Sequence, residues 1–176
     1  FTSRPTKGKT SRQYNQHACV ALQDGRLLLI GDRSRVLEIF DPDTEQFHAC
    51  QARMPTVIDD VAATLLYDGT VLIAGGQNVF TSVCVNNTWR YDPVADELHE
   101  GPILTPTAPT GPQPGVSDMA IADLFAHDPK RAGRYFFLCG GEYDPGREVE
   151  PYQDVVLDSA WVYDAVSRQF IDVGPM

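Results

Sequence analysis

The 176-residue chain has few basic residues and no long apolar run. It carries 14 Lys and Arg against 24 Asp and Glu, a formal net charge of −10. Such a charge repels phosphate backbones, so we expect no nucleic-acid partner. No apolar run approaches the roughly 20 residues that span a bilayer, and no signal-peptide pattern is present. We therefore expect no membrane partner; a cytoplasmic location is favoured, although the sequence does not fix the compartment.

The sequence also lacks the common signatures of catalysis and metal binding. The four histidines show no HxH or HExxH spacing, and there is no GxSxG motif or phosphate-binding loop. We predict no catalytic residue, no metal ligand and no cofactor. The four cysteines show no CxxC spacing, so we interpret them as small apolar core residues, two of them (Cys19 and Cys139) in buried strands. They are Cys19, Cys50, Cys84 and Cys139.

The sequence does contain the pattern of short β-strands separated by turn residues. In residues 61–104, an apolar run at 61–67 is followed by Asp68-Gly69 and a second apolar run at 70–74. Asp-Gly between apolar runs predicts a hairpin with a type I′ turn, which needs positive φ at both central residues. Two further strands, within 88–93 and 97–102, make a unit of four.

The same four-strand pattern occurs before and after this unit. In each unit the third strand ends in Asp, and a large apolar residue follows six positions later. These pairs are Asp41 and Phe47, Asp92 and Leu98, and Asp164 and Phe170. A period of 40-odd residues with four strands per unit is typical of a β-propeller blade.

These units resemble kelch repeats, of the kind also found in galactose-oxidase-like propellers. The resemblance rests on the apolar-Gly-Gly strand end, the aromatic-x-Tyr-Asp-Pro strand and the large residue six later. Gly31-Asp32 and Asp164-Ala165 depart from the pattern. The resemblance implies an all-β fold, a β-propeller of four-stranded antiparallel blades. Three blades are expected in this chain, at about 17–55, 61–104 and 117–176, after a flexible polar segment at 1–16.

Each strand of a unit has an expected place. Small residues suit first strands near a propeller axis, and apolar second strands suit burial on both faces. Asp at the end of a third strand is expected to form the turn. Alternation along third strands puts pairs of aromatic side chains on one face, which we expect to pack against the next blade. They are Trp89 with Tyr91, and Trp161 with Tyr163.

The loops differ most among the units. The loop at 142–159 is rich in carboxylates, and the link at 105–116 is rich in proline. By the resemblance, both lie on one face that binds a protein partner, and long loops on a rigid scaffold often carry function. The predicted binding residues are Glu142, Tyr143, Asp144, Arg147, Glu148, Glu150, Tyr152 and Asp154.

Three blades do not close a ring, because propellers generally have four or more. The chain is therefore expected to be a fragment, to pair with a second copy as a six-bladed homodimer, or to be completed by another chain. We predict a non-catalytic protein-interaction module. The alternatives are part of a kelch-type enzyme (a copper radical oxidase or a sugar-active propeller) and an architectural half-ring that self-associates.

Overall fold

The computed structural model describes residues 16–31, 33–108, 111–112, 114–144 and 154–176, which form β-strands and no helix. The predicted flexible segment therefore lies almost entirely outside the described residues. Within them, no helix is long and apolar enough to cross a membrane. The expected all-β class is confirmed, as are the four-stranded antiparallel sheets.

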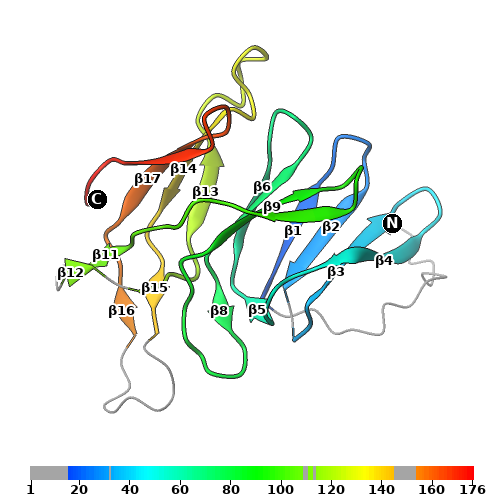
Figure 1. Cartoon of the computed structure of the whole chain (residues 1–176). Helices are drawn as coiled ribbons and strands as arrows, with labels where there is room; N and C mark the ends of the chain where they lie inside the picture. The colour runs from blue at the N-terminus through cyan, green and yellow to red at the C-terminus, as the bar shows by residue number, and fades with distance from the viewer. Residues whose placement is uncertain (1–15, 32, 109–110, 113, 145–153) are drawn as a thin grey trace, which may run out of the picture.

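Three four-stranded sheets follow one another along the chain (Figure 1). Sheet I contains β1 (His17–Ala21), β2 (Leu27–Gly31), β3 (Val36–Asp41) and β4 (Gln46–Arg53). Sheet II contains β6 (Ala62–Leu65), β7 (Val71–Ala74), β9 (Thr88–Asp92) and β10 (Glu97–Glu100). Sheet III contains β13 (Ala120–Asp123), β14 (Tyr135–Cys139), β17 (Ala160–Asp164) and β18 (Gln169–Asp172). Among the first strands, β6 contacts both β1 and β13, and the sheets fan out from these strands.

Three two-stranded pairs lie outside these sheets, two of them (β5–β8 and β15–β16) at the lower side of Figure 1 and one (β11–β12) at its left. They are β5 (Ile58–Asp59) with β8 (Gln77–Asn78), β11 (Thr107–Ala108) with β12 (Gly111–Pro112), and β15 (Glu142–Tyr143) with β16 (Val155–Val156). They belong to connections between second and third strands and between sheets. We call the side that they form the loop face.

The hairpins predicted at the two Asp-Gly pairs are present, but their turn type is not the one expected. Gly25 and Gly69 have φ of 89° and 84°, whereas Asp24 and Asp68 do not have positive φ. In the first hairpin Gly25 N–H donates to the Leu22 carbonyl, and Leu22 N–H donates to the Arg26 carbonyl. This is the turn with a glycine bulge that typifies longer hairpin loops, so the type I′ prediction is wrong.

The aspartates that end the third strands form turns, as predicted. Oδ1 of each accepts hydrogen bonds from the backbone N–H groups two and three residues later, at 2.8–2.9 Å and 3.1–3.3 Å. They are Asp41, Asp92 and Asp164. The turn brings the residue six after each aspartate opposite the preceding aromatic, and the Phe40–Phe47 and Tyr163–Phe170 rings lie 4.8 and 4.9 Å apart.

Two apolar cores fill the spaces between neighbouring sheets. Trp89 and Tyr91 of sheet II pack with Leu28 and Ile39 of sheet I. Trp161 and Tyr163 of sheet III pack in the same way with Leu72 and Ala74 of sheet II. The aromatic pairs therefore face the preceding sheet, and the expectation that they pack against the next one is wrong.

Burial of the second strands depends on whether a sheet covers each face. All four residues of β7 are buried, because sheets I and III lie on either side of it. In β14 burial alternates, so the expectation of a strand buried on both faces is wrong for sheet III. Cys139 in this strand is only half-buried and Cys19 is exposed, whereas Cys50 and Cys84 are buried. The buried-strand prediction thus fails for Cys19.

Close backbone approach explains the second glycine of the pair that follows β14. Gly141 has a φ of 91°, and a Cβ there would lie 2.3 Å from the Ser117 carbonyl oxygen. Gly25 has a similar φ of 89° but has open space around it. The two positions therefore separate the cost of backbone strain from the cost of a steric clash.

We expect Gly25→Ala to lower the free energy of unfolding by about 1 kcal/mol, the cost of a left-handed residue with a Cβ. Gly141→Ala should cost at least about 2 kcal/mol more, because the backbone around Ser117 must also move. Urea unfolding of both variants measures the difference. Equal losses would contradict the close approach of Gly141 to Ser117.

Candidate functional site

The loop face is held together by a compact node of polar groups between sheets II and III. Gln77 Nε2 donates to Asp144 Oδ2 at 2.9 Å, and Asp144 N–H donates to Cys84 Sγ at 3.2 Å. The Cys84 sulfur also lies 3.3 Å from Ser117 Oγ. Burial raises the pKa of the Cys84 thiol. A buried thiol whose pKa is raised is a poor nucleophile. The polar contacts around Cys84 therefore have a structural role.

The predicted binding residues do not all belong to one exposed surface. Glu142 and Tyr143 are half-buried in β15, and Tyr143 packs against the core between sheets II and III. Asp144 is buried, with 1% of its surface exposed, whereas Asp154 is exposed. The remaining four predicted residues lie outside the described residues. They are Arg147, Glu148, Glu150 and Tyr152.

Two carboxylates that the sequence reasoning missed lie where sheets II and III begin. Asp60 and Asp118 occupy the same position in their units, just before β6 and β13, and Gln16 occupies it before β1. Asp118 N–H donates to the Asp60 carbonyl at 3.1 Å, and Asp60 N–H donates to the Gln16 carbonyl at 3.0 Å. This main-chain ladder links the three sheets at the loop face.

All three ladder residues have left-handed backbone conformations. The φ angles of Gln16, Asp60 and Asp118 are 55°, 52° and 55°. Asp and Asn adopt this conformation more readily than most other residues. Polar residues directly before the small-residue strands are the sequence signal that could have indicated these positions.

The ladder brings carboxylates together at the loop face. Burial raises the pKa of Asp60 to about 7, and the charges of Asp118, Asp59 and Glu142 add to the shift. Burial likewise raises the pKa of Glu142, with contributions from Asp154 and Asp118. The neighbouring charges that raise these two pKa values are all carboxylates. We call Asp59, Asp60, Asp118, Glu142 and Asp154 the acidic cluster.

The acidic cluster is suited to attracting cations rather than to a defined metal coordination. Among the described residues, no group of three or more His, Cys, Asp or Glu side chains is arranged to hold a metal ion. The cluster can offer hydrogen-bond acceptors and negative potential to a cationic group that approaches the loop face. A positive charge placed there would favour ionisation of Asp60.

Neither protein-family models nor curated proteins give a match to this chain.

The raised pKa of Asp60 predicts how stability depends on pH. The folded state holds a proton on Asp60 up to about pH 7, whereas the unfolded state loses it near 3.8. Since the folded state binds more protons in this window, Asp60 makes the protein less stable as pH rises from about 4 to 7. Asp60→Asn mimics the neutral carboxyl and accommodates the left-handed φ. We therefore expect the variant's gain in Tm over wild type to increase across this window.

Thermal unfolding at several pH values tests this expectation. Asp43→Asn, in an exposed turn of sheet I, is the matched control and should leave the pH profile unchanged. A constant Tm difference between Asp60→Asn and wild type from pH 4 to 8 would show that Asp60 titrates normally.

Proposed function

We propose that this chain supplies three kelch-like blades of a β-propeller that serves as a protein–protein interaction module. Its loop face would bind a basic segment of a protein partner. The blade assignment is supported by the common strand order of the three sheets, their shared Asp turns and the contacts among their first strands. A scaffold that presents its loops on one face, with packed cores behind them, is suited to recognition.

The acidic cluster is the observation that carries the proposed partner chemistry. Asp118 and Asp154 are exposed, and Asp60 and Glu142 are half-buried beside them. Burial and, to a smaller extent, repulsion from neighbouring carboxylates raise the pKa values of Asp60 and Glu142, so a Lys or Arg side chain from a partner would relieve that repulsion. Complementary charge of this kind speeds association and selects partners.

Within this proposal the predicted binding residues divide into two roles. Glu142 and Asp154 face the partner as part of the acidic cluster. Asp144 and Tyr143 support the surface from below, since Asp144 bonds with Gln77 and Tyr143 packs against the core. A direct contact of Arg147, Glu148, Glu150 or Tyr152 with the partner stays a prediction.

Binding of a basic peptide tests the proposed function. A fluorescent peptide of alternating Arg and Ser should bind wild-type protein and bind the double variant Asp118→Asn/Glu142→Gln about fivefold more weakly, because two partly exposed charge pairs are lost. Fluorescence polarisation at low salt measures the affinity. Glu97→Gln, at an exposed position of β10, is the control with unchanged binding. If Glu97→Gln weakened peptide binding as much as the double variant does, the overall net charge and not the acidic cluster would be responsible for the attraction.

A second candidate, self-association into a ring, rests on two uncovered sheet faces. Sheet III carries a cross-strand apolar row of Ala122, Phe137, Val162 and Ile171, and Ile171 is 53% exposed. On sheet I, the half-buried Phe40 and Phe47 occupy the face that corresponds to the covered aromatic faces of sheets II and III. Packing sheet III of one copy on sheet I of another would repeat the contacts within the chain.

Solution mass by light scattering tests this second candidate. A ring of two copies predicts twice the monomer mass, and Ile171→Asp should convert it to monomer by placing a charge in the new contact. Ile103→Asp is the matched control, because Ile103 is equally exposed but lies outside the apolar row. A wild-type monomer at high concentration would argue against self-association and leave the peptide-binding proposal intact.

A further inference from the structure

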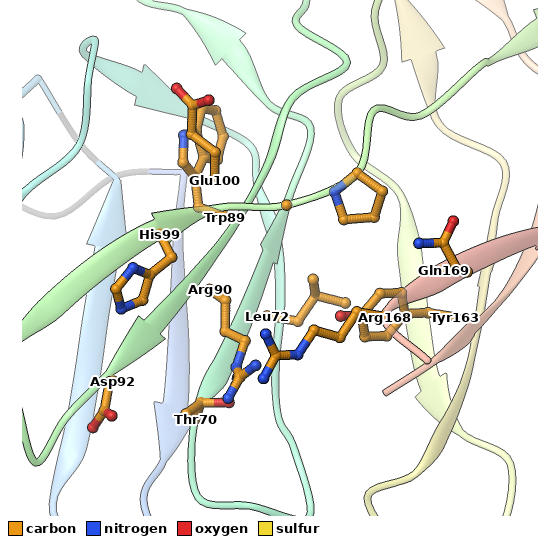
Figure 2. Close-up of a pocket in the computed structure, with 12 residues that line it drawn as sticks. Thr70, Leu72, Trp89, Arg90, Asp92, His99, Glu100, Tyr163, Arg168 and Gln169 are labelled. Atoms are coloured by element: carbon orange, nitrogen blue, oxygen red, sulfur yellow. Dashed lines mark hydrogen bonds between the residues drawn. The ribbon is translucent and has the colours of Figure 1, made fainter. Parts of the chain in front are cut away.

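A pocket of about 410 Å³ lies between the outer strands of sheets II and III. Leu72 of sheet II, Pro102 just after β10 and Tyr163 of sheet III give it apolar walls. Two arginines, Arg90 from β9 and Arg168 from the turn before β18, extend into it (Figure 2). Asp92 and Arg168 come from turns at the strand ends opposite the loop face, so the pocket is distinct from the acidic cluster.

The strand register shows that Arg90 interrupts an otherwise apolar row. In sheet I, Leu28 pairs with Ile39, and in sheet III, Phe137 pairs with Val162. The corresponding pair in sheet II is Leu72 with Arg90. Of these three equivalent pairs, only the pair in sheet II contains a charged side chain. This is also the pair that lies beside the large pocket.

The turn position opposite Arg90 also differs between the two interfaces. At the contact of sheets I and II, the Asp96 carboxylate accepts the backbone N–H groups of Gln51 and Ala52 at 2.6 and 3.2 Å, and it also accepts the Tyr91 hydroxyl. This clamp leaves a pocket of only about 170 Å³. The equivalent residue at the contact of sheets II and III is Arg168, with a similar φ of 59°. An arginine side chain has no hydrogen-bond acceptor, so it cannot form the clamp that Asp96 forms. The larger pocket lies at this second interface.

Arg90 is held in a fixed orientation by polar partners. Its Nε donates to Thr70 Oγ1 at 2.7 Å and its Nη2 donates to Asp68 Oδ2 at 2.9 Å. Only 19% of the Arg90 side chain is exposed. These bonds engage Nε and Nη2, so the Nη1 group is the part of the guanidinium that remains for a ligand. Side-chain bonds that lock an arginine in place reduce the entropy lost when it binds a ligand.

Carboxylates also lie around the pocket, but within the described part of the chain none of them forms an ion pair with Arg168. Asp68 balances Arg90, and the Asp92 carboxylate is engaged by the N–H groups of its own turn. Glu100 lies at the rim, and Figure 2 shows its carboxylate pointing away from the guanidinium groups. Within the described part of the chain, the Arg168 guanidinium makes no hydrogen bond or ion pair.

We propose that the pocket between sheets II and III binds a small organic anion, whose carboxylate or phosphate group lies between Arg90 and Arg168 while its apolar part contacts Leu72 and Pro102. Guanidinium groups bind both kinds of oxyanion through paired, charge-assisted hydrogen bonds. The apolar walls favour an organic molecule over an inorganic ion. The site does not depend on the protein-interaction proposal, because it uses other residues and the opposite strand ends.

Titration with benzoate, phenyl phosphate and the neutral benzyl alcohol tests the site, with NMR signals of the arginine Nε–H groups as the readout. We expect either anion to shift the Arg90 and Arg168 signals, and the tighter of the two identifies the preferred oxyanion. Benzyl alcohol should leave these signals in place. Arg168→Asn, which accommodates the left-handed φ, should weaken anion binding at least tenfold, about the value of one charge-assisted pair.

Arg26→Gln is the matched control, because Arg26 lines the smaller pocket at the equivalent interface. This variant should bind the anions as wild type does. Three outcomes would overturn the proposal: no shift of the Arg90 signal with either anion, binding that Arg168→Asn leaves unchanged, or equal binding of benzyl alcohol. A well-dispersed amide spectrum of each variant shows that folding is retained.

Discussion

The structure depends on one repeated contact, in which the aromatic face of a third strand packs against the sheet that precedes it. Trp89 and Tyr91 fill the space beside sheet I, and Trp161 and Tyr163 fill the space beside sheet II. All four side chains are at most 4% exposed. Burial of one large aromatic side chain contributes roughly 2–3 kcal/mol, so these two contacts dominate what holds the sheets together.

Tight packing of the sheets at their first strands explains the acidic cluster. The ladder from Asp118 through Asp60 to Gln16 requires left-handed residues that can also donate their N–H groups. Asp meets the conformational requirement, but two aspartates in adjacent sheets then lie near Glu142. The electrostatic strain is therefore a consequence of the geometry that joins the sheets, and the same carboxylates would attract the cationic partner that we propose for the loop face.

The two interfaces show how one packing scheme can yield either a clamp or a pocket. Asp96 closes the first interface by accepting N–H groups from β4, which extends over eight residues. At the second interface the corresponding strand β10 has four residues, and Arg168 replaces the aspartate. Changes at a few equivalent positions thus alter the chemistry of an interface while the aromatic contact that holds it remains.

The sequence by itself determined the strands of the three four-stranded sheets, the positions of their hairpins and the turn role of Asp41, Asp92 and Asp164, because these features follow from local backbone preferences. It did not determine which face the aromatics cover, that Cys19 is exposed, or that Asp144 is buried, because each depends on which sheet lies alongside. The cluster around Asp60 and the pocket around Arg90 join residues from different repeats. Only the packing of one sheet on the next brings such residues together, so the tertiary structure alone decided them.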